Sequence, residues 1–251
     1  MGKLLSDPLT NYKAKKNKKL QVDTYFLSLA QSDLSGYNTC PMANKFIAKE
    51  NNPKKANCSA VCVGSRGNAQ IFPDVREARI KKTKRFFEDR QNFMNELVTE
   101  IAKAIIKSNS KGIKPTFRLN SYSDIRWETI KINKFGNNTI YELFPDIQFY
   151  DYTKLENRNI PNGYHTTYSH WGDWIATKKA MARGQNVAMV FSNQHELPKT
   201  FMGKIVVDGD KTDLRTPEND GKGVIVGLLA KMSKQAMNNE LKKDISFIVN
   251  G

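Results

Sequence analysis

The chain of 251 residues is poor in cysteine and in histidine, with three of each. It has no run of about 18 apolar residues, the length that a membrane-spanning helix needs, so we expect no membrane span and no membrane partner. The first twenty residues lack the apolar segment of a signal peptide, which together with the few cysteines indicates a cytoplasmic setting. Walker A, GxGxxG, HExxH and GxSxG patterns are absent, which argues against a kinase, a Rossmann dehydrogenase, a zincin or a serine hydrolase.

Acidic residues are fewer than basic residues in this chain. Its 40 Lys and Arg against 25 Asp and Glu give a formal net charge of +15. Such an excess favours polyanionic partners, nucleic acid first, although lysine also serves solubility alone. The lysines of residues 1–20 are dense enough to predict a flexible basic arm ahead of one domain over 21–251.

The three cysteines lie close together in the sequence. Cys40, Cys58 and Cys62 fall within 23 positions, in a segment that we place at 36–70. An odd number of cysteines cannot pair completely as disulfides, and thiolates bind soft metals, so the spacing predicts a shared metal site. An iron–sulfur cluster with one open position fits three thiolates, whereas a fourth ligand from His or Asp would make a structural zinc site. Gly64 and Gly67 follow and would let backbone N–H groups approach a cluster or an anion.

Helical and strand patterns alternate along the rest of the chain. Apolar spacing predicts a helix over 75–108, either continuous or kinked, with Asp74 as its N-cap, and shorter helices over 171–183 and 233–241. Short apolar segments between them predict a parallel α/β sheet. We expect a partial or complete (β/α) barrel, with an open parallel sheet as the alternative. The predicted strands are 22–30, 116–120, 146–153, 164–169, 186–192, 204–210 and 223–230.

Polar residues gather where these strands end. Because parallel strands present their carboxyl ends at one edge, we expect the side chains there to line a ligand pocket. Carboxylates could bind Mg²⁺ or exchange protons, and the cations could clamp an anion. The candidate catalytic residues are Asp124, Glu128, Asp151, Lys154, Asp208 and Asp210, and the candidate cofactor-binding residues are Arg118, Asn120 and Ser169 as well as Gly64 and Gly67.

The order of motifs resembles the phage gene-product-88 family. The resemblance rests on SGYNTCP, CSAVCVGSRG, RLNSYSDIRWE, FYDYTK, VAMVF, VVDGDKTDLR and GVIVGLLAK, from about residue 25 to 232. It implies a phage source, and hence the cytoplasm of an infected cell. Such proteins look similar to radical-SAM-like barrels, in which three cysteines hold a [4Fe–4S] cluster and the open iron binds S-adenosylmethionine. The radical-SAM cysteine spacing is shorter than the seventeen and three intervening residues of this chain.

Three functions follow as hypotheses. The first is an iron–sulfur, radical-SAM-like enzyme acting on nucleic acid or nucleotides. The second is a non-catalytic nucleic-acid-binding protein with a structural metal site. The third is a Mg²⁺-dependent nuclease that uses Asp124, Asp151, Asp208 and Asp210.

Overall fold

A computed structural model describes residues 2–42, 62, 72–192, 196–230, 235, 238–239, 242 and 246–250. The chain divides into two compact units, whereas we expected one domain after residue 20. The first unit contains the described residues up to Pro41, then Cys62, 72–151 and Arg158–His165. The second contains Met42, Tyr152–Asn157 and the described residues from Thr166 onward. Cys58, Gly64, Gly67 and most of the predicted helix over 233–241 lie outside the described residues.

The first unit is built on a sheet in the order β1-β2-β3-β4. β2 pairs in parallel with β3, and β3 with β4, while the edge strand β1 runs antiparallel to β2. Thr24 and Thr116 lie opposite each other in β2 and β3, and their hydroxyl oxygens are 2.9 Å apart. The four strands are β1 (Leu5–Ser6), β2 (Val22–Leu27), β3 (Lys114–Arg118) and β4 (Gln148–Thr153).

Two helices form where the sequence allows one long helix or a kinked one. α4 (Pro73–Glu88) and α5 (Arg90–Asn109) are separated at Asp89, whose φ of −136° and ψ of 55° leave the helical region. Asp74 lies inside the first turn of α4 and does not cap it; the N-cap is Phe72, which has no side-chain oxygen to offer. An acidic side chain in the first turn, such as that of Asp74, is favoured by the positive end of the helix dipole.

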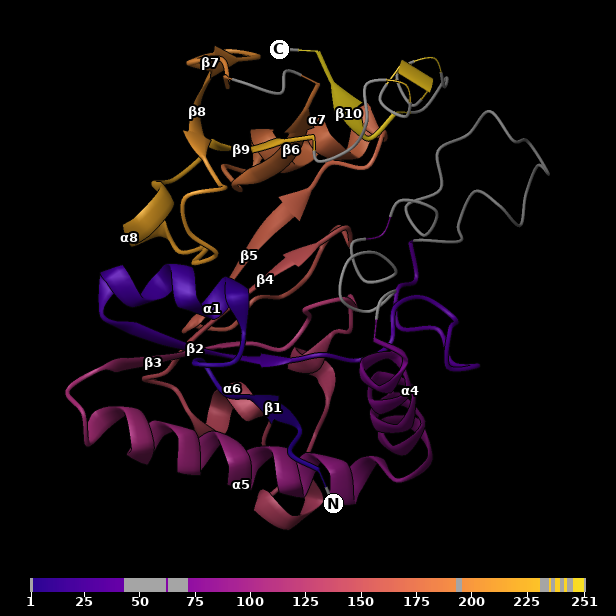
Figure 1. Cartoon of the computed structure of the whole chain (residues 1–251), viewed down its shortest axis with the longest axis vertical. Coiled ribbons are helices and arrows are strands. Elements are labelled where there is room, and N and C mark those ends of the chain that lie inside the picture. Colours follow the sequence, from indigo (N-terminus) through magenta and orange to yellow (C-terminus); the bar gives the residue numbers. More distant parts are fainter. Residues whose placement is uncertain are drawn as a thin grey trace. The chain divides into compact units, whose positions relative to one another are not determined.

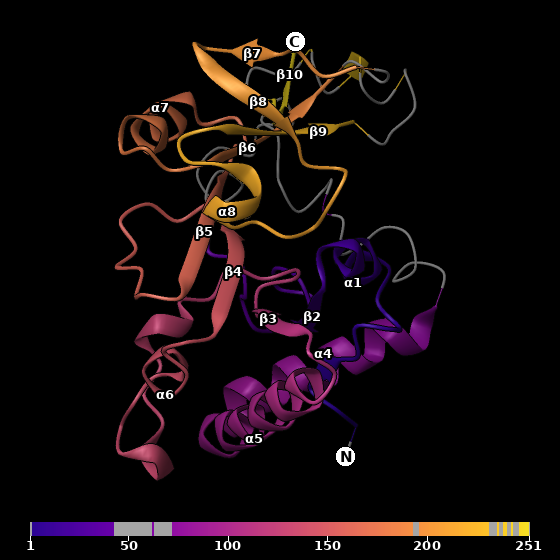
Figure 2. The same cartoon turned by 90° about the vertical axis from the view of Figure 1, so that its left-hand side faces the viewer.

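The apolar stripe of α5 forms the core of the first unit. Figures 1 and 2 show α5 on one side of β2 and β3 and α1 (Tyr12–Asn17) on the other. The helix buries every third or fourth side chain, as an amphipathic helix does. Fully buried side chains of α5 in this core include Phe93, Met94, Leu97 and Ile101. The short elements of this unit are η1 (Lys18–Leu20), η4 (Trp127–Thr129), η5 (Asn133–Phe135) and α6 (Ile140–Leu143).

Residues 2–20 are folded against the first unit, which corrects the expectation of a flexible arm. Leu4 and Leu5 are buried, and their backbone N–H groups each donate to the Glu100 carboxylate at 2.8 Å. Ala14 of α1 is also fully buried. Apolar residues between the lysines thus anchor the segment, while Lys15, Lys18 and Lys19 remain exposed.

The second unit carries the order β5-β6-β9-β8-β7, with β10 also on β6. The first two residues of β5, Tyr164 and His165, belong to the first unit. β6 pairs in parallel with β5, β9 and β10, and β7 is an antiparallel edge strand on β8. α7 (Trp174–Ala182) contributes Ala176 and Ala180 to the apolar core of this unit. Its strands are β5 (Tyr164–Ser169), β6 (Val187–Phe191), β7 (Thr200–Phe201), β8 (Lys204–Asp208), β9 (Ile225–Leu229) and β10 (Ile248–Val249), and a short helix α8 covers Pro217–Asp220.

The α/β class and the mostly parallel pairing are confirmed. The sheet is open, which is the alternative that we set beside a barrel, and β1 and β7 are its edge strands. Each of the seven predicted strands overlaps an observed one, because buried parallel strands carry continuous apolar segments. Among the described residues no helix is both long and apolar enough to cross a membrane.

Candidate functional site

β4 carries a carboxylate into the interior of the first unit. Asp151 lies within the strand and its residue exposure is 0%. Burial raises the pKa of this carboxyl to about 7, although the guanidinium groups of Arg118 and Arg158 and the N–H of Asn120 all oppose the shift. The removal of water outweighs these interactions, because no bulk solvent stabilises the charged form there.

Two predicted residues from the end of β3 contact this carboxylate. The backbone N–H of Asn120 donates to Asp151 Oδ1 at 2.7 Å, and Arg118 Nε lies 4.0 Å from the same oxygen. The side-chain oxygen of Asn120 accepts from Ser123, from the backbone N–H of Ile125 and from the indole of Trp127 at 2.8–3.0 Å. The Asn120 amide therefore shapes the loop after β3 and is occupied by it, which leaves little for a cofactor.

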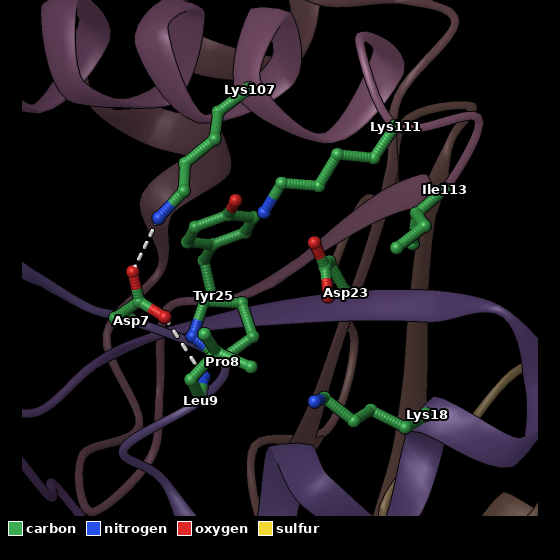
Figure 3. Close-up of a pocket in the computed structure, with 9 residues that line it drawn as sticks. All are labelled: Asp7, Pro8, Leu9, Lys18, Asp23, Tyr25, Lys107, Lys111 and Ile113. Carbon is green, nitrogen blue, oxygen red and sulfur yellow. Dashed lines mark hydrogen bonds and ion pairs between the residues drawn. The ribbon is translucent and has the colours of Figure 1, made fainter.

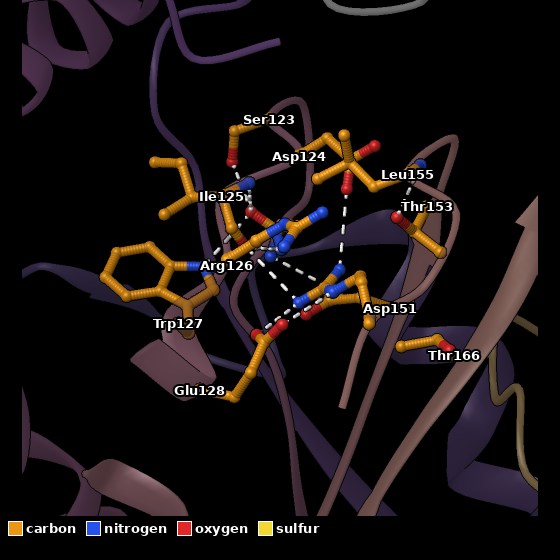
Figure 4. A network of polar contacts seen from close by, with 12 residues as sticks. Ser123, Asp124, Ile125, Arg126, Trp127, Glu128, Asp151, Thr153, Leu155 and Thr166 are labelled. Atoms are coloured by element: carbon orange, nitrogen blue, oxygen red, sulfur yellow. Dashed lines mark hydrogen bonds and ion pairs between the residues drawn. The ribbon is translucent and has the colours of Figure 1, made fainter. Parts of the chain in front are cut away.

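Arg158 joins the remaining carboxylates of the cluster. Figure 4 shows the three carboxylates concerned, those of Asp124, Glu128 and Asp151. Its Nε and one terminal nitrogen bind the two oxygens of Glu128 at 2.9 and 2.6 Å, a bidentate arrangement. The other terminal nitrogen lies 3.5 Å from Asp124 Oδ1. The Arg158 side chain is only 2% exposed. We call the set Arg118, Asp124, Glu128, Asp151, Arg158 and Tyr164 the arginine–carboxylate cluster.

Tyr164 links Arg158 to Asp151. Its hydroxyl accepts from Arg158 at 3.1 Å and donates to Asp151 Oδ2 at 3.1 Å. Burial raises the pKa of Tyr164 well above its ordinary value, so the phenol stays protonated and remains a donor. The Tyr141 ring stacks on it with centroids 4.5 Å apart. The result is a continuous series of hydrogen bonds from a fixed cation to a carboxyl that titrates near neutrality, which is suited to holding or moving one proton.

Cys40 lies beside the loop that carries Asp124. The backbone N–H of Asp124 donates to the Thr39 carbonyl at 2.8 Å, and Cys40 Sγ lies 3.4 Å from the Tyr122 carbonyl oxygen. The backbone N–H of Ser32 donates to Cys40 Sγ at 3.5 Å. Ser32 has a φ of 50°, a conformation that few L-residues other than Asn and Asp adopt readily. The loop is thus held in a specific form around this thiol.

Other predicted site residues lie in the second unit. Lys154 donates to the Ser169 hydroxyl at 3.3 Å, so these two candidates do meet. Asp208 follows as the last residue of β8, where its carboxylate accepts from the backbone N–H of Asp210 at 2.9 Å. Asp210 in turn accepts from the Leu229 N–H at 3.0 Å. Both aspartates therefore organise the turn after β8.

His170, which directly follows β5, is buried. Its Nδ1 is 2.8 Å from the Thr177 hydroxyl, and the Trp174 ring lies 4.3 Å from the imidazole centroid. Burial lowers the pKa of His170 to about 4, so the ring is neutral at physiological pH. His195 lies outside the described residues.

The site also contains Arg158, Tyr164 and Tyr141, which the sequence patterns did not predict as site residues. Arg158 sits in a polar loop, ENRNIPNG, whose composition indicates only a surface connection. The one available signal was its position between two predicted strands, one of which ends in acidic residues. Within the described part of the chain, no three His, Cys, Asp or Glu side chains converge on a common metal position.

Fold and cluster together define an open-sheet α/β protein with a buried arginine–carboxylate cluster at the ends of β3 and β4. The chain belongs to the gene product 88 family, whose model matches residues 3–247. No curated protein and no solved structure matches the chain.

Proposed function

We propose that the protein is a metalloenzyme that acts on nucleic acid or nucleotides, with a metal centre held by Cys40, Cys58 and Cys62. The observation that carries the proposal is the position of Cys40. Its segment is tied through Thr39 and Cys40 itself to the loop from Tyr122 to Asp124. A centre bound at this thiol would lie close to the arginine–carboxylate cluster, where a protein group can exchange a proton near neutral pH.

The surroundings of Cys40 fit a metal-bound thiolate. The sulfur accepts a backbone N–H from Ser32, an interaction that stabilises negative charge on sulfur and tunes metal centres. On deprotonation the thiol would lose its contact to the Tyr122 carbonyl and retain the Ser32 donor. Three cysteines suit a [4Fe–4S] cluster with one open iron, which would supply redox chemistry and a position for S-adenosylmethionine; zinc is the alternative metal.

The chain's own residues have distinct roles in this proposal. Asp151 would hold or release a proton, since its pKa lies near 7. Tyr164 and Arg158 would fix the orientation of that carboxyl through the hydrogen bonds described above. Exposed cations of the first unit would attract the phosphates of a nucleic acid; they include Lys15, Lys19, Arg76, Lys81 and Lys84.

Anaerobic purification tests the metal centre directly. We expect a brown protein with about four irons per chain, and Cys40→Ser should lose both the iron and the visible absorbance. Tyr37→Phe is the matched control, because it alters the same loop without touching a sulfur. It removes the hydroxyl that donates to the exposed Glu88 carboxylate and keeps the ring that stacks on Phe87. A colourless protein that holds stoichiometric zinc would exclude the iron–sulfur enzyme.

A non-catalytic nucleic-acid-binding protein with a structural metal is the second candidate. The hydrogen bonds from Arg158 to the carboxylates of Glu128 and Asp124 favour this candidate. Carboxylates that are paired with a buried arginine stabilise a fold as readily as they take part in a reaction. In that case binding of DNA or RNA should weaken steeply with salt, and Asp151→Asn should leave the affinity unchanged. Any turnover of nucleotide or nucleic acid that Asp151→Asn abolishes selects the enzyme instead.

A further inference from the structure

A second site lies at the opposite edge of the first unit's sheet. A pocket of about 140 Å³ opens where β2 and β3 begin, whereas the arginine–carboxylate cluster lies where β3 and β4 end (Figure 3). None of the proposed metal ligands lines this pocket. The lining residues are Asp7, Pro8, Leu9, Lys18, Asp23, Tyr25, Lys107, Lys111 and Ile113.

Three lysines and two aspartates give the pocket its charge. Lys107 is neutralised by Asp7, whose carboxylate lies 2.6 Å from its ammonium group. Within the described residues, the ammonium groups of Lys18 and Lys111 have no hydrogen-bond or ion-pair partner. Figure 3 shows these two side chains extending from opposite sides toward the region of Asp23 and Tyr25. The pocket therefore offers two available cations.

The helix dipole explains only part of this arrangement. Lys107 lies in the last turn of α5 and Lys111 directly follows its C-cap, a region where cations are favourable in any protein. Lys18 comes from a different element, η1, so the dipole of α5 does not explain why it lines the same pocket. Convergence of lysines from two elements on one pocket indicates an anionic ligand, and lysine is a common point-charge partner of phosphate.

Asp23 restricts which anion can bind. One of its oxygens accepts from Ser108 at 3.1 Å, and among the described residues the other oxygen has no donor. A fully deprotonated anion would be repelled by this carboxylate. A phosphate monoester has a second pKa of about 6 and can carry a proton that donates to Asp23. Sulfate carries no proton at neutral pH and cannot make this hydrogen bond.

We infer that this pocket binds a protonatable phosphoryl group, with Lys18 and Lys111 as cationic partners and Asp23 as the acceptor of the phosphate proton. Internal phosphodiesters lack that proton, so the ligand is inorganic phosphate or a terminal phosphate of a nucleotide or oligonucleotide. In both cases the recognised chemistry is the same.

Isothermal titration of the full-length protein with inorganic phosphate and with sulfate tests the inference. We expect phosphate to bind at least about tenfold more tightly than sulfate, a difference of about 1.4 kcal/mol. The Lys18→Gln/Lys111→Gln double variant should lose about tenfold or more in phosphate affinity. Asp23→Asn should bring sulfate to the affinity of phosphate. Equal binding of the two anions by the wild type, or no binding of phosphate, would overturn the inference.

A double variant of equal charge controls for the general positive field. Lys103→Gln/Lys134→Gln removes two exposed lysines of the same unit that lie outside the pocket, and phosphate affinity should be retained. An equal loss in both double variants would show that only the net charge matters and would refute the site. Competition by a 5′-phosphorylated oligonucleotide, but not by its unphosphorylated form, would identify the end of a nucleic acid as the source. Absence of competition by both would identify free phosphate.

Discussion

Removing Arg158 should be among the most costly single substitutions in the first unit. Its guanidinium makes two bonds to Glu128, at 2.9 and 2.6 Å, and lies 3.5 Å from Asp124. The side chains of Glu128 and Asp124 are only 6% and 10% exposed, so water cannot replace the lost cation. Loss of one partner of a buried ion pair costs about 3–5 kcal/mol, and we expect Arg158→Met to lower the free energy of unfolding by this amount.

Arg158→Lys should have a smaller effect. Lysine retains the charge but cannot form the bidentate contact with Glu128, so the loss should be about 1.5–3 kcal/mol, the contribution of one hydrogen bond to a charged group. Urea unfolding followed by far-UV circular dichroism measures both changes. Lys131→Met is the control, since its ion pair with Glu142 has side chains that are 53% and 49% exposed. This control should be close to wild type.

The pH dependence of Arg158→Met distinguishes an unpaired charge from a packing defect. A buried carboxylate that has lost its cation is costly while it is charged, and protonation removes that cost. Its deficit relative to wild type should therefore shrink as the pH is lowered. A loss below about 1 kcal/mol, or a deficit that does not depend on pH, would refute the reasoning.

Two further substitutions test individual features of the fold. Asp151 has a pKa of about 7 in the folded state against an ordinary value of 3.8, so its contribution to stability falls as the pH rises through this range. Asp151→Asn should remove that dependence. From pH 4 to pH 7 the unfolding free energy of the variant should therefore rise relative to that of the wild type. Gly227→Ala in β9 should destabilise the protein by about 1–3 kcal/mol, because a Cβ there would lie 2.8 Å from Val206 and 2.9 Å from Leu197. Gly2→Ala is the control and should have little effect, because a Cβ there would have nothing within 4 Å. Thermal unfolding measures both changes, and equal effects would contradict the predicted steric clash at Gly227.

The candidate site was partly accessible from the sequence. The rule that ligands gather where parallel strands end pointed to Asp124, Glu128 and Asp151, and all three contribute to the arginine–carboxylate cluster. Asp208 and Asp210 satisfied the same rule yet belong to the second unit, where they hold a turn. A rule based on strand ends cannot tell which strands share one compact unit.

The N-terminal segment illustrates a second limit of sequence reasoning. Dense lysines between residues 13 and 19 indicated a solvated arm, whereas Leu4 and Leu5 bind Glu100 of α5 through their backbone N–H groups. The partner is about 95 residues away along the chain, so no local sequence pattern predicts this contact. The composition of a segment indicates whether its side chains can be exposed to solvent. Whether the segment folds against the protein depends on the hydrogen-bond acceptors that the tertiary structure brings to it.

The amino-acid sequence determined the α/β class, the parallel strands, the helical stretch on either side of Asp89 and the strong positive charge, because periodicity and composition act over short distances. The tertiary structure decided which of the acidic residues meet, that Arg158 joins Asp124 and Glu128, and that burial sets the pKa of Asp151 near neutrality. Desolvation and ion pairing depend on groups brought together from distant parts of the chain, so they exist only once the chain has folded.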